Sequence, residues 1–130
     1  MRIRVEMTEL QTYENLCEYL LSMRASSKDM PFGMDVLTFR VMQKMFALMA
    51  WQEEPISLSL KCDPLQARIL CNTYTAIKPG YHLNKKHWIT VTCDGSVSDV
   101  VLAELMSQSY ALVAAGLSKE QKAYLAQIED

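Results

Sequence analysis

The stretch ISLSLKC, residues 56–62, limits the possible fold more than any other part of the chain. Apolar and polar residues alternate along it, which is typical of a β-strand with one face in a core and the other toward solvent. It is the clearest strand signal in the sequence. The predicted buried face carries Ile56, Leu58 and Leu60, and the predicted outer face carries Ser57, Ser59 and Lys61.

Two further strands are predicted directly before this one. DVLTFRV (35–41) is rich in β-forming residues, Met42-Gln43-Lys44 is a tight connection, and MFALMAW (45–51) is the partner strand. QEEP (52–55) then forms a second turn. Three consecutive strands with short connections predict an antiparallel meander.

Helices are predicted before and after this meander in the sequence. Residues 9–23 have apolar side chains at helical spacing after a Thr8–Gln11 capping box, and residues 24–33 are predicted as a loop. Asp63-Pro64 begins a second helix, because aspartate caps free amides and proline suits the first helical position. The remaining elements are a strand at 87–93, a long helix capped by Ser96 or Ser98 and closed by Gly116, and a short helix that begins at Ser118 with Gln121.

The element order is therefore α-β-β-β-α-β(β)-α-α, which predicts an α+β fold. A single antiparallel sheet would contain the three-strand meander plus the later strands, with helices packed on one face. The 130 residues are predicted to form one domain, 1–130. Its core should bury Phe39, Phe46, Leu48, Ile56, Leu58, Leu60, Val91, Leu102, Leu105 and Leu112.

Composition excludes several classes of protein. Half of the residues are hydrophobic and 22% are charged, which is typical of a globular chain and not of a disordered one. The apolar runs are shorter than the roughly 20 residues that span a bilayer, and the N-terminal stretch carries no export signal. We therefore expect a cytoplasmic protein with no membrane role. Dispersed cysteines are predicted to be buried free thiols, namely Cys17, Cys62, Cys71 and Cys93.

The segment KPGYHLNKKHW, residues 78–88, gathers cations and aromatic groups. It holds three lysines, both histidines of the chain, a tyrosine and a tryptophan, and it contains no acid. The net charge of the chain is −2, divided as −1 over residues 1–31, +2 over 32–95 and −3 over 96–130. This distribution favours an anionic partner at the central segment.

Catalytic and metal-binding interpretations of this segment have little support. His82 and His87 are five residues apart, unlike the i, i+4 pair of a zinc-binding helix, and the segment has no acid to complete a metal site. Cys62 or Cys93 as a nucleophile would need a distant histidine that the sequence does not place. No phosphate-binding glycine loop or G-x-S-x-G elbow is present. We expect no enzymatic activity, no cofactor and no metal.

The chain resembles the small bacterial MmcQ/YjbR family in five stretches: PFGMDVLTFRVMQKMFALMA (31–50), LSLKCDP (58–64), PGYHLNKKHWITV (79–91), DGSV (94–97) and SYALV (109–113). The resemblance implies an α+β fold with an antiparallel sheet, related to CyaY and to secretion-chaperone-like architectures. It also implies a DNA-binding protein with a double-wing motif. Two positions depart from the family pattern: Gln43 stands where glycine is frequent in the first hairpin turn, and Ile89 stands where a polar residue is frequent.

The leading hypothesis is a non-enzymatic DNA-binding protein that uses the central basic and aromatic segment. Lysines would contact phosphates, while an amide or an aromatic group would contact or stack on bases. The candidate residues are Lys44, Lys61, Lys78, Tyr81, His82, Asn84, Lys85, Lys86, His87 and Trp88.

Two alternatives stay open. The segment 78–88 is predicted to be an ordered turn and strand entry with Trp88 packed in the fold and Lys85 and Lys86 at the surface, and these lysines could simply keep an edge strand soluble. The chain could also be a small protein- or ligand-binding module with a chaperone-like fold. Its nine methionines suit an adaptable apolar surface, although most fall on predicted core faces. Salt should weaken DNA binding steeply and leave binding in an apolar groove largely unchanged.

Overall fold

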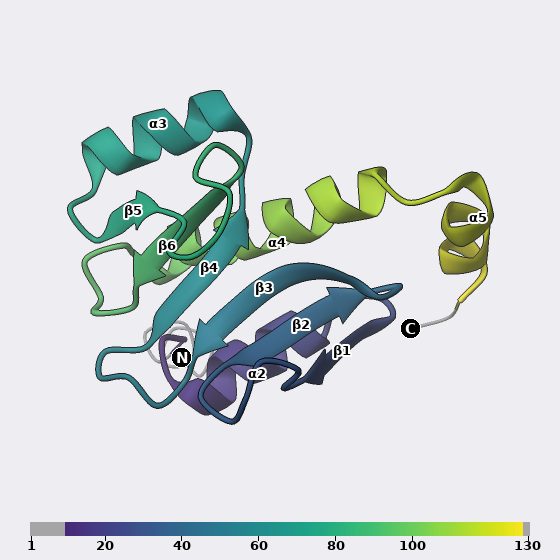
Figure 1. Cartoon of the computed structure of the whole chain (residues 1–130), viewed down its shortest axis with the longest axis horizontal. Helices are drawn as coiled ribbons and strands as arrows, with labels where there is room; N and C mark the ends of the chain where they lie inside the picture. The colour runs from purple at the N-terminus through teal and green to yellow at the C-terminus, as the bar shows by residue number, and fades with distance from the viewer. Residues whose placement is uncertain (1–9, 129–130) are drawn as a thin grey trace, which may run out of the picture.

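The computed structural model describes residues 10–128, which form a six-stranded antiparallel sheet with four helices (Figure 1). The strand order is β1-β2-β3-β4-β6-β5, so the predicted meander forms the neighbouring strands β2, β3 and β4. The predicted α+β fold with one antiparallel sheet is confirmed. The helices are α2 (Tyr13–Leu21), α3 (Pro64–Thr73), α4 (Asp99–Ala115) and α5 (Lys119–Gln127), and the strands are β1 (Ser26–Asp29), β2 (Leu37–Val41), β3 (Lys44–Ala50), β4 (Ser57–Lys61), β5 (Ile77–Pro79) and β6 (Trp88–Thr92).

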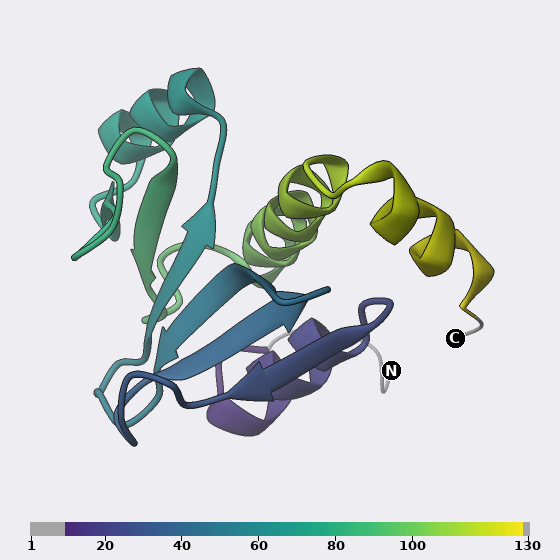
Figure 2. The same cartoon turned by 45° about the vertical axis from the view of Figure 1, so that its right-hand side comes forward.

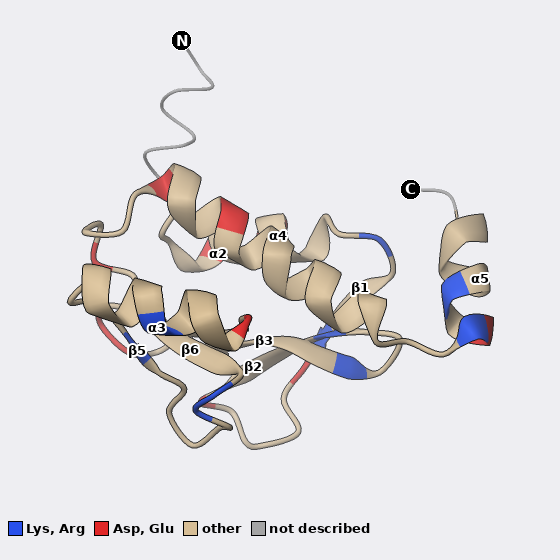
Figure 3. Ribbon diagram, turned by 90° about the horizontal axis from the view of Figure 1, so that it is seen from above, with Lys and Arg blue, Asp and Glu red and all other residues tan. Residues whose placement is uncertain are grey.

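The sheet has one covered face and one open face. It twists strongly between β3 and β4, so that β4 and β6 turn away from β1 and β2 (Figure 2). Helices α2, α3 and α4 lie on one side of the sheet, as predicted (Figure 3). Helix α4 crosses β2, β3 and β4, while α3 packs beside β5 and β6 and α2 beside β1. Among residues 10–128, only loops border the opposite face of the sheet.

Strand β1 corrects the prediction that residues 24–33 form a loop. Residues Ser26–Asp29 pair antiparallel with β2, and Lys28 lies opposite Phe39. This strand is the edge of the sheet, and three of its four residues are exposed. Backbone hydrogen bonds to β2 hold it there, and its sequence SSKD therefore needs no apolar alternation. A search for periodic hydrophobic residues cannot detect such a strand.

The hairpin between β2 and β3 turns on two residues with positive φ. Met42 has φ 49° and Gln43 has φ 75°. A two-residue turn with positive φ at both positions matches the right-handed twist of the flanking strands. Residues other than glycine seldom adopt this conformation. Glycine would therefore suit position 43 better than glutamine does.

The core lies between the sheet and the helices and contains most of the predicted residues. Phe39, Phe46, Leu58, Leu60, Val91, Leu102 and Leu105 are buried as predicted.

Three of the predicted core residues are more exposed to solvent than the sequence analysis predicted. Leu48 and Ile56 are half-buried, and Leu112 is 40% exposed. Leu48 lies opposite Ser59 in the register and faces the open side of the sheet. Leu112 belongs to a helix whose sequence is apolar on most sides, so its periodicity does not indicate which face is buried.

Helix α2 begins later than predicted, at Tyr13, with Thr12 as its N-cap. The Thr12 hydroxyl accepts from the Asn15 amide at 3.2 Å. Gln11 precedes this N-cap, and the third helical position is Asn15. The Gln11 side-chain amide instead donates to the Val97 carbonyl at 2.8 Å and to the Asp99 carboxylate at 2.7 Å, and its Oε1 accepts from an amide of the same loop at 3.0 Å. Thr8 lies outside the described residues. Gln11 thus ties the start of α2 to the loop before α4.

The other predicted helix starts agree with the structure. Asp63 caps α3, Ser98 caps α4, and Ser118 forms a capping box with Gln121 at the start of α5. Within the described part of the chain, no helix has the length and apolar character needed to cross a membrane.

A buried hydroxyl from α4 connects β3 and β4 at the point where their backbone hydrogen bonding to each other ends. Ser109 has no exposed surface; its Oγ donates to the Phe46 carbonyl at 2.5 Å and accepts from the Lys61 amide at 2.8 Å. The ladder between β3 and β4 ends at the preceding pair, Ala47 and Leu60. Ser109 therefore replaces one backbone hydrogen bond between the strands and bonds the helix to both of them.

Candidate binding groove on the open sheet face

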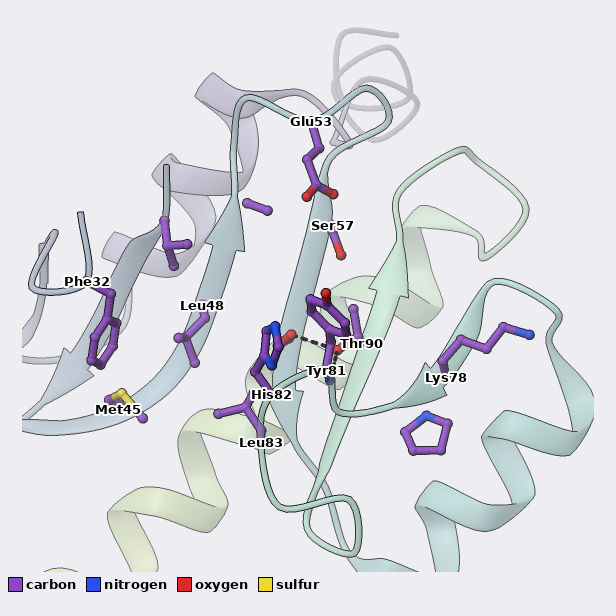
Figure 4. A pocket seen from close by; sticks show the side chains of 14 residues that line it. Phe32, Met45, Leu48, Glu53, Ser57, Lys78, Tyr81, His82, Leu83 and Thr90 are labelled. Atoms are coloured by element: carbon purple, nitrogen blue, oxygen red, sulfur yellow. Dashed lines mark hydrogen bonds between the residues drawn. The ribbon is translucent and has the colours of Figure 1, made fainter. Parts of the chain in front are cut away.

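A groove of about 700 Å³ occupies the open face of the sheet. Its floor comes from β3, β4 and β6, and its walls come from the loops around residues 32–36 and 80–83 (Figure 4). The lining combines aliphatic, aromatic and hydroxyl groups with two charged residues, Glu53 and Lys78. Grooves of this size and mixed lining are common ligand sites in proteins.

The floor contains a row of side chains that crosses four strands in register. Leu48 of β3 lies opposite Ser59 of β4, Ser59 opposite Thr90 of β6, and Thr90 opposite Lys78 of β5. Residues in register point to the same side of an antiparallel sheet. The hydroxyls of Ser59 and Thr90 are hydrogen-bonded at 2.8 Å. The outward-facing residues of ISLSLKC therefore contribute a polar group to the groove floor. We call the hydrogen-bonded pair Ser59 and Thr90 the hydroxyl seam.

One wall is formed by Tyr81 and His82. Their ring centroids are 3.9 Å apart with an interplanar angle of 49°, and both side chains are exposed. His82 has φ 60°, in the left-handed region, and the Tyr81 amide donates to Thr90 Oγ1 at 3.0 Å. These features place two rings over the hydroxyl seam (Figure 4).

The facing wall is apolar. Phe32 and Val36 form it, next to Met45 and Leu48 at the β3 edge of the floor. Phe32 is 61% exposed, which is unusual for a phenylalanine, and it stands on the loop before β2. The groove thus separates an aliphatic and phenyl wall from a tyrosine and histidine wall.

The loop 80–87 is held by its own polar groups. The Asn84 side chain accepts from the amides of Lys86 at 2.9 Å and His87 at 3.3 Å. Lys85 Nζ donates to the Gly80 carbonyl at 2.9 Å. The prediction that both lysines extend free from the loop is therefore wrong for Lys85, because its ammonium folds back on the loop.

The entry to β6 is packed closely, in agreement with the prediction that Trp88 belongs to the fold. Trp88 is buried, and it alternates with the core residue Ile89 and shares a face with Thr90. The Gly80 amide donates to the Trp88 carbonyl at 2.8 Å. A Cβ on Gly80 would lie 2.7 Å from Trp88 Cβ, so only glycine fits at this position.

The structure brings some of the ten predicted residues together and separates others. Lys78, Tyr81 and His82 line the groove, and Lys61 lies on the same face because it is two residues from Ser59 on the same strand. Lys44 lies opposite the core residue Val41, and so on the covered side of the sheet. The rest surround the 80–87 loop: Asn84, Lys85, Lys86 and His87 are exposed, and Trp88 is buried.

The groove also contains residues that were not predicted as site residues. They are Phe32, Met45, Leu48, Ser59 and Thr90 among others. The alternation of residues 56–62 pointed to an outer face, but it did not indicate that this face forms a concave floor. Phe32 gave a weak signal, because a large aromatic group beside Gly33 in a polar loop is out of place in a solvated turn.

Charged residues of both signs are spread over the molecule. Figure 3 shows acidic segments on α2 and on several loops, and basic segments on the sheet, on its loops, on α3 and on α5. The acids of the helical side include Glu14, Glu18 and Glu104, which are exposed. Lys61, Lys78, Lys85 and Lys86 lie on the sheet face or its loops, together with the exposed acids Asp35, Glu53 and Glu54.

The cysteines have raised pKa values because they are desolvated. Burial raises the pKa of Cys62 to about 11 and that of Cys93 to about 12, with nearby Asp63 and Asp94 adding to the respective effect. All four cysteines are free, and three are buried. A thiol with a raised pKa stays protonated at neutral pH and is a poor nucleophile. Among residues 10–128, no group of three histidine, cysteine or acidic side chains is arranged to hold a metal ion.

The fold and groove define a class of small α+β proteins with one helix-covered sheet face and one open face. The YjbR family model matches residues 21–112, from the end of α2 to α4. The chain belongs to the YjbR family, as the resemblance had implied.

Known relatives agree with this assignment. The chain is 37% identical over 92 residues to the uncharacterized protein YbdF of Escherichia coli O157:H7, covering 71% of this chain and 75% of that protein. It is 28% identical over 117 residues to the uncharacterized protein YjbR of Escherichia coli K12, covering 90% and 99%.

Two crystal structures share the fold. The Deinococcus radiodurans protein DR2400 is 39% identical with a TM-score of 0.86, over 92% of this chain and 91% of that chain. A Pseudomonas syringae protein is 25% identical with a TM-score of 0.66, over 78% and 97%.

Proposed function

We propose that this protein is a non-enzymatic DNA-binding protein of the cytoplasm and that DNA contacts the open sheet face. The observation that carries the proposal is the coincidence of exposed aromatic rings with a group of lysines on and around the open sheet face. Tyr81 is 70% exposed and Phe32 61%, and both line a groove whose surroundings carry several lysines. Free thiols suit a reducing compartment such as the cytoplasm.

Lysines of this face would provide the electrostatic part of binding. Each lysine that neutralises a phosphate releases a counterion, so the affinity falls with added salt. Lys61, Lys78 and Lys86 are the cations best placed for this contact, since Lys85 is already bonded to the loop. The acidic residues of the helical side would repel DNA and orient it toward the sheet.

The test is a fluorescence anisotropy titration of labelled DNA at two salt concentrations. We expect binding at low salt that weakens as salt rises. Lys61→Ala and Lys78→Ala should each lower the affinity and reduce the salt slope by about one charge. A flat titration with folded protein at low salt would refute the proposal.

Lys44→Ala is the matched control, because Lys44 lies on the covered side. It should leave DNA binding unchanged. The double-wing arrangement expected from the family resemblance makes a different prediction, in which the β2–β3 hairpin tip contacts DNA. A loss confined to Lys44→Ala would favour that arrangement over the open face.

A second candidate function is binding of an apolar peptide or small molecule. Its support is the aliphatic wall formed by Met45, Leu48 and Val36. Such binding depends on buried apolar area and responds little to salt. A hydrophobic fluorescent dye that binds the groove equally at low and high salt, with no DNA binding under either condition, would favour this candidate.

A further inference from the structure

We propose that the groove accepts a single unstacked base, so that the protein prefers single-stranded to double-stranded DNA. This inference rests on the proposed function and specifies the form of nucleic acid that the same site takes. Three features carry it: the recessed shape of the site, the two aromatic walls, and the hydroxyl seam on the floor.

The shape of the site favours an extruded base over a duplex. The bases of a duplex are reached by protein elements that project into its grooves. Here the aromatic groups line a hollow between the loop before β2 and the loop after β5 (Figure 4). A base can enter this hollow only after it has left its stack.

The walls provide two surfaces for stacking. Phe32 stands on one side and the Tyr81–His82 pair on the other, and their exposure leaves ring surface available. Every base has an apolar face that stacks on such rings, which makes aromatic grooves suited to single strands of varied sequence. The lining also contains the aliphatic side chains Val36, Leu48 and Leu83, which are compatible with the same planar guest.

The floor provides polar contacts for the edge of the base. Ser59 and Thr90 share one hydrogen bond of 2.8 Å, while Thr90 Oγ1 also accepts from the Tyr81 amide. Two hydroxyls have two hydrogens, and their mutual bond uses one. The other is left for a carbonyl oxygen or ring nitrogen of a base.

The charges match a base in the groove with its phosphate outside. Lys78 extends from the rim with its ammonium directed away from the groove centre, where it can meet the backbone (Figure 4). Glu53 lines the groove beside Ser57 and disfavours a phosphate at that end. Its carboxylate can accept a hydrogen bond from an exocyclic amino group.

The experiment compares three fluorescently labelled DNAs of equal length by anisotropy: a single strand, the duplex of the same sequence, and a single strand of abasic sites. The single strand should bind about tenfold more tightly than the other two, in line with the energy of one base–aromatic stack. The abasic strand keeps the phosphates and therefore separates base contacts from charge.

Tyr81→Ala and Phe32→Ala should each weaken single-strand binding about 5- to 10-fold, near the lower limit for loss of one base–aromatic stack. They should leave duplex affinity, salt slope and thermal stability unchanged. Tyr81→Phe should keep the affinity. Tyr124→Ala is the matched control, since Tyr124 is 58% exposed on α5, away from the groove lining.

Two outcomes overturn the inference in distinguishable ways. Duplex binding as tight as single-strand binding, or equal loss with both DNAs in Tyr81→Ala, removes the base-in-groove arrangement and leaves the proposed function standing. Binding to none of the three DNAs removes the proposed function as well.

Discussion

The two faces of the sheet differ in what their side chains do, although they alternate along the same strands. On β4, Leu58 and Leu60 have no exposed surface and lie under the helices, whereas Ser59 between them faces the groove. The covered face is closed by α2, α3 and α4, and the open face is bordered by loops. One alternating sequence therefore encodes stability on one side and a binding surface on the other.

The difference also shows in how hydrogen bonds are used. On the covered face, the Ser109 hydroxyl satisfies backbone groups of two strands. On the open face, Ser59 and Thr90 bond to each other and keep one hydrogen unused. The Ser109 hydroxyl thus completes the fold, while the pair Ser59 and Thr90 keeps a hydrogen for a partner.

The largest effect should come from truncating the covered face. Leu58→Ala should lower the free energy of unfolding by about 2–5 kcal/mol, because it leaves a cavity in a fully buried site. Ser59→Ala, one residue away on the open face, should cost less than about 1 kcal/mol. Urea unfolding of both variants measures the contrast, and equal losses would show that the two faces do not differ in this way.

The Ser109 bridge should come next. Ser109→Ala should cost about 1–3 kcal/mol, because the Phe46 carbonyl and the Lys61 amide lose their shared partner while buried. Ser107→Ala is the control on the same helix, since its exposed hydroxyl makes a 2.7 Å bond to Tyr19 Oη. Thermal and urea unfolding should separate the two. A Ser109 variant as stable as the Ser107 variant would mean that water replaces the bridge.

Close packing on the open face can be tested at Gly80. Gly80→Ala should cost about 1–3 kcal/mol, because the added Cβ collides with Trp88 and forces the backbone apart. Gly116→Ala is the control, since its nearest atom would be 3.6 Å away. The fluorescence of Trp88 should shift in the first variant only. If Gly80→Ala leaves the stability unchanged, the 80–87 loop can shift to make room for the added Cβ at little energetic cost.

Alkaline pH should weaken the covered face through its thiols. Burial raises the pKa of Cys93 from 9.0 to about 12, so above pH 9 the unfolded chain releases a proton that the folded chain keeps. The free energy of unfolding should therefore fall as pH rises above 9. Cys93→Ala should flatten this fall more than Cys71→Ala, because Cys71 is only half-buried, so that desolvation raises its pKa less, and Lys78 partly offsets the rise. Urea unfolding from pH 8 to 10.5 measures both slopes.

The smallest effect should come from the paired lysines of the loop. Lys86→Ala should change stability by less than about 0.5 kcal/mol, as expected for an exposed surface residue. Lys85→Ala should cost slightly more, up to about 1 kcal/mol, since it removes the bond to the Gly80 carbonyl. If Lys85→Ala changes the thermal stability as little as Lys86→Ala does, both lysines are equally available to DNA.

Local patterns were sufficient for most of the elements. The meander, the caps at Asp63, Ser98 and Ser118, and the buried phase of β4 were all predicted correctly, because each depends on residues a few positions apart. Strand β1 was missed because an edge strand held by backbone bonds carries no apolar period. The site was predicted in part, since Lys78, Tyr81 and His82 line the groove but Lys44 lies on the other side.

The sequence by itself determined the alternation of β4 and the capped helices, because short-range sterics and hydrogen bonding set these features. Only the tertiary structure decided which strands became neighbours and which face the helices left open. The row from Leu48 to Lys78 joins residues up to 42 positions apart, on four strands that meet through twist and register. No local pattern specifies such a meeting, because it results from the packing of the whole core.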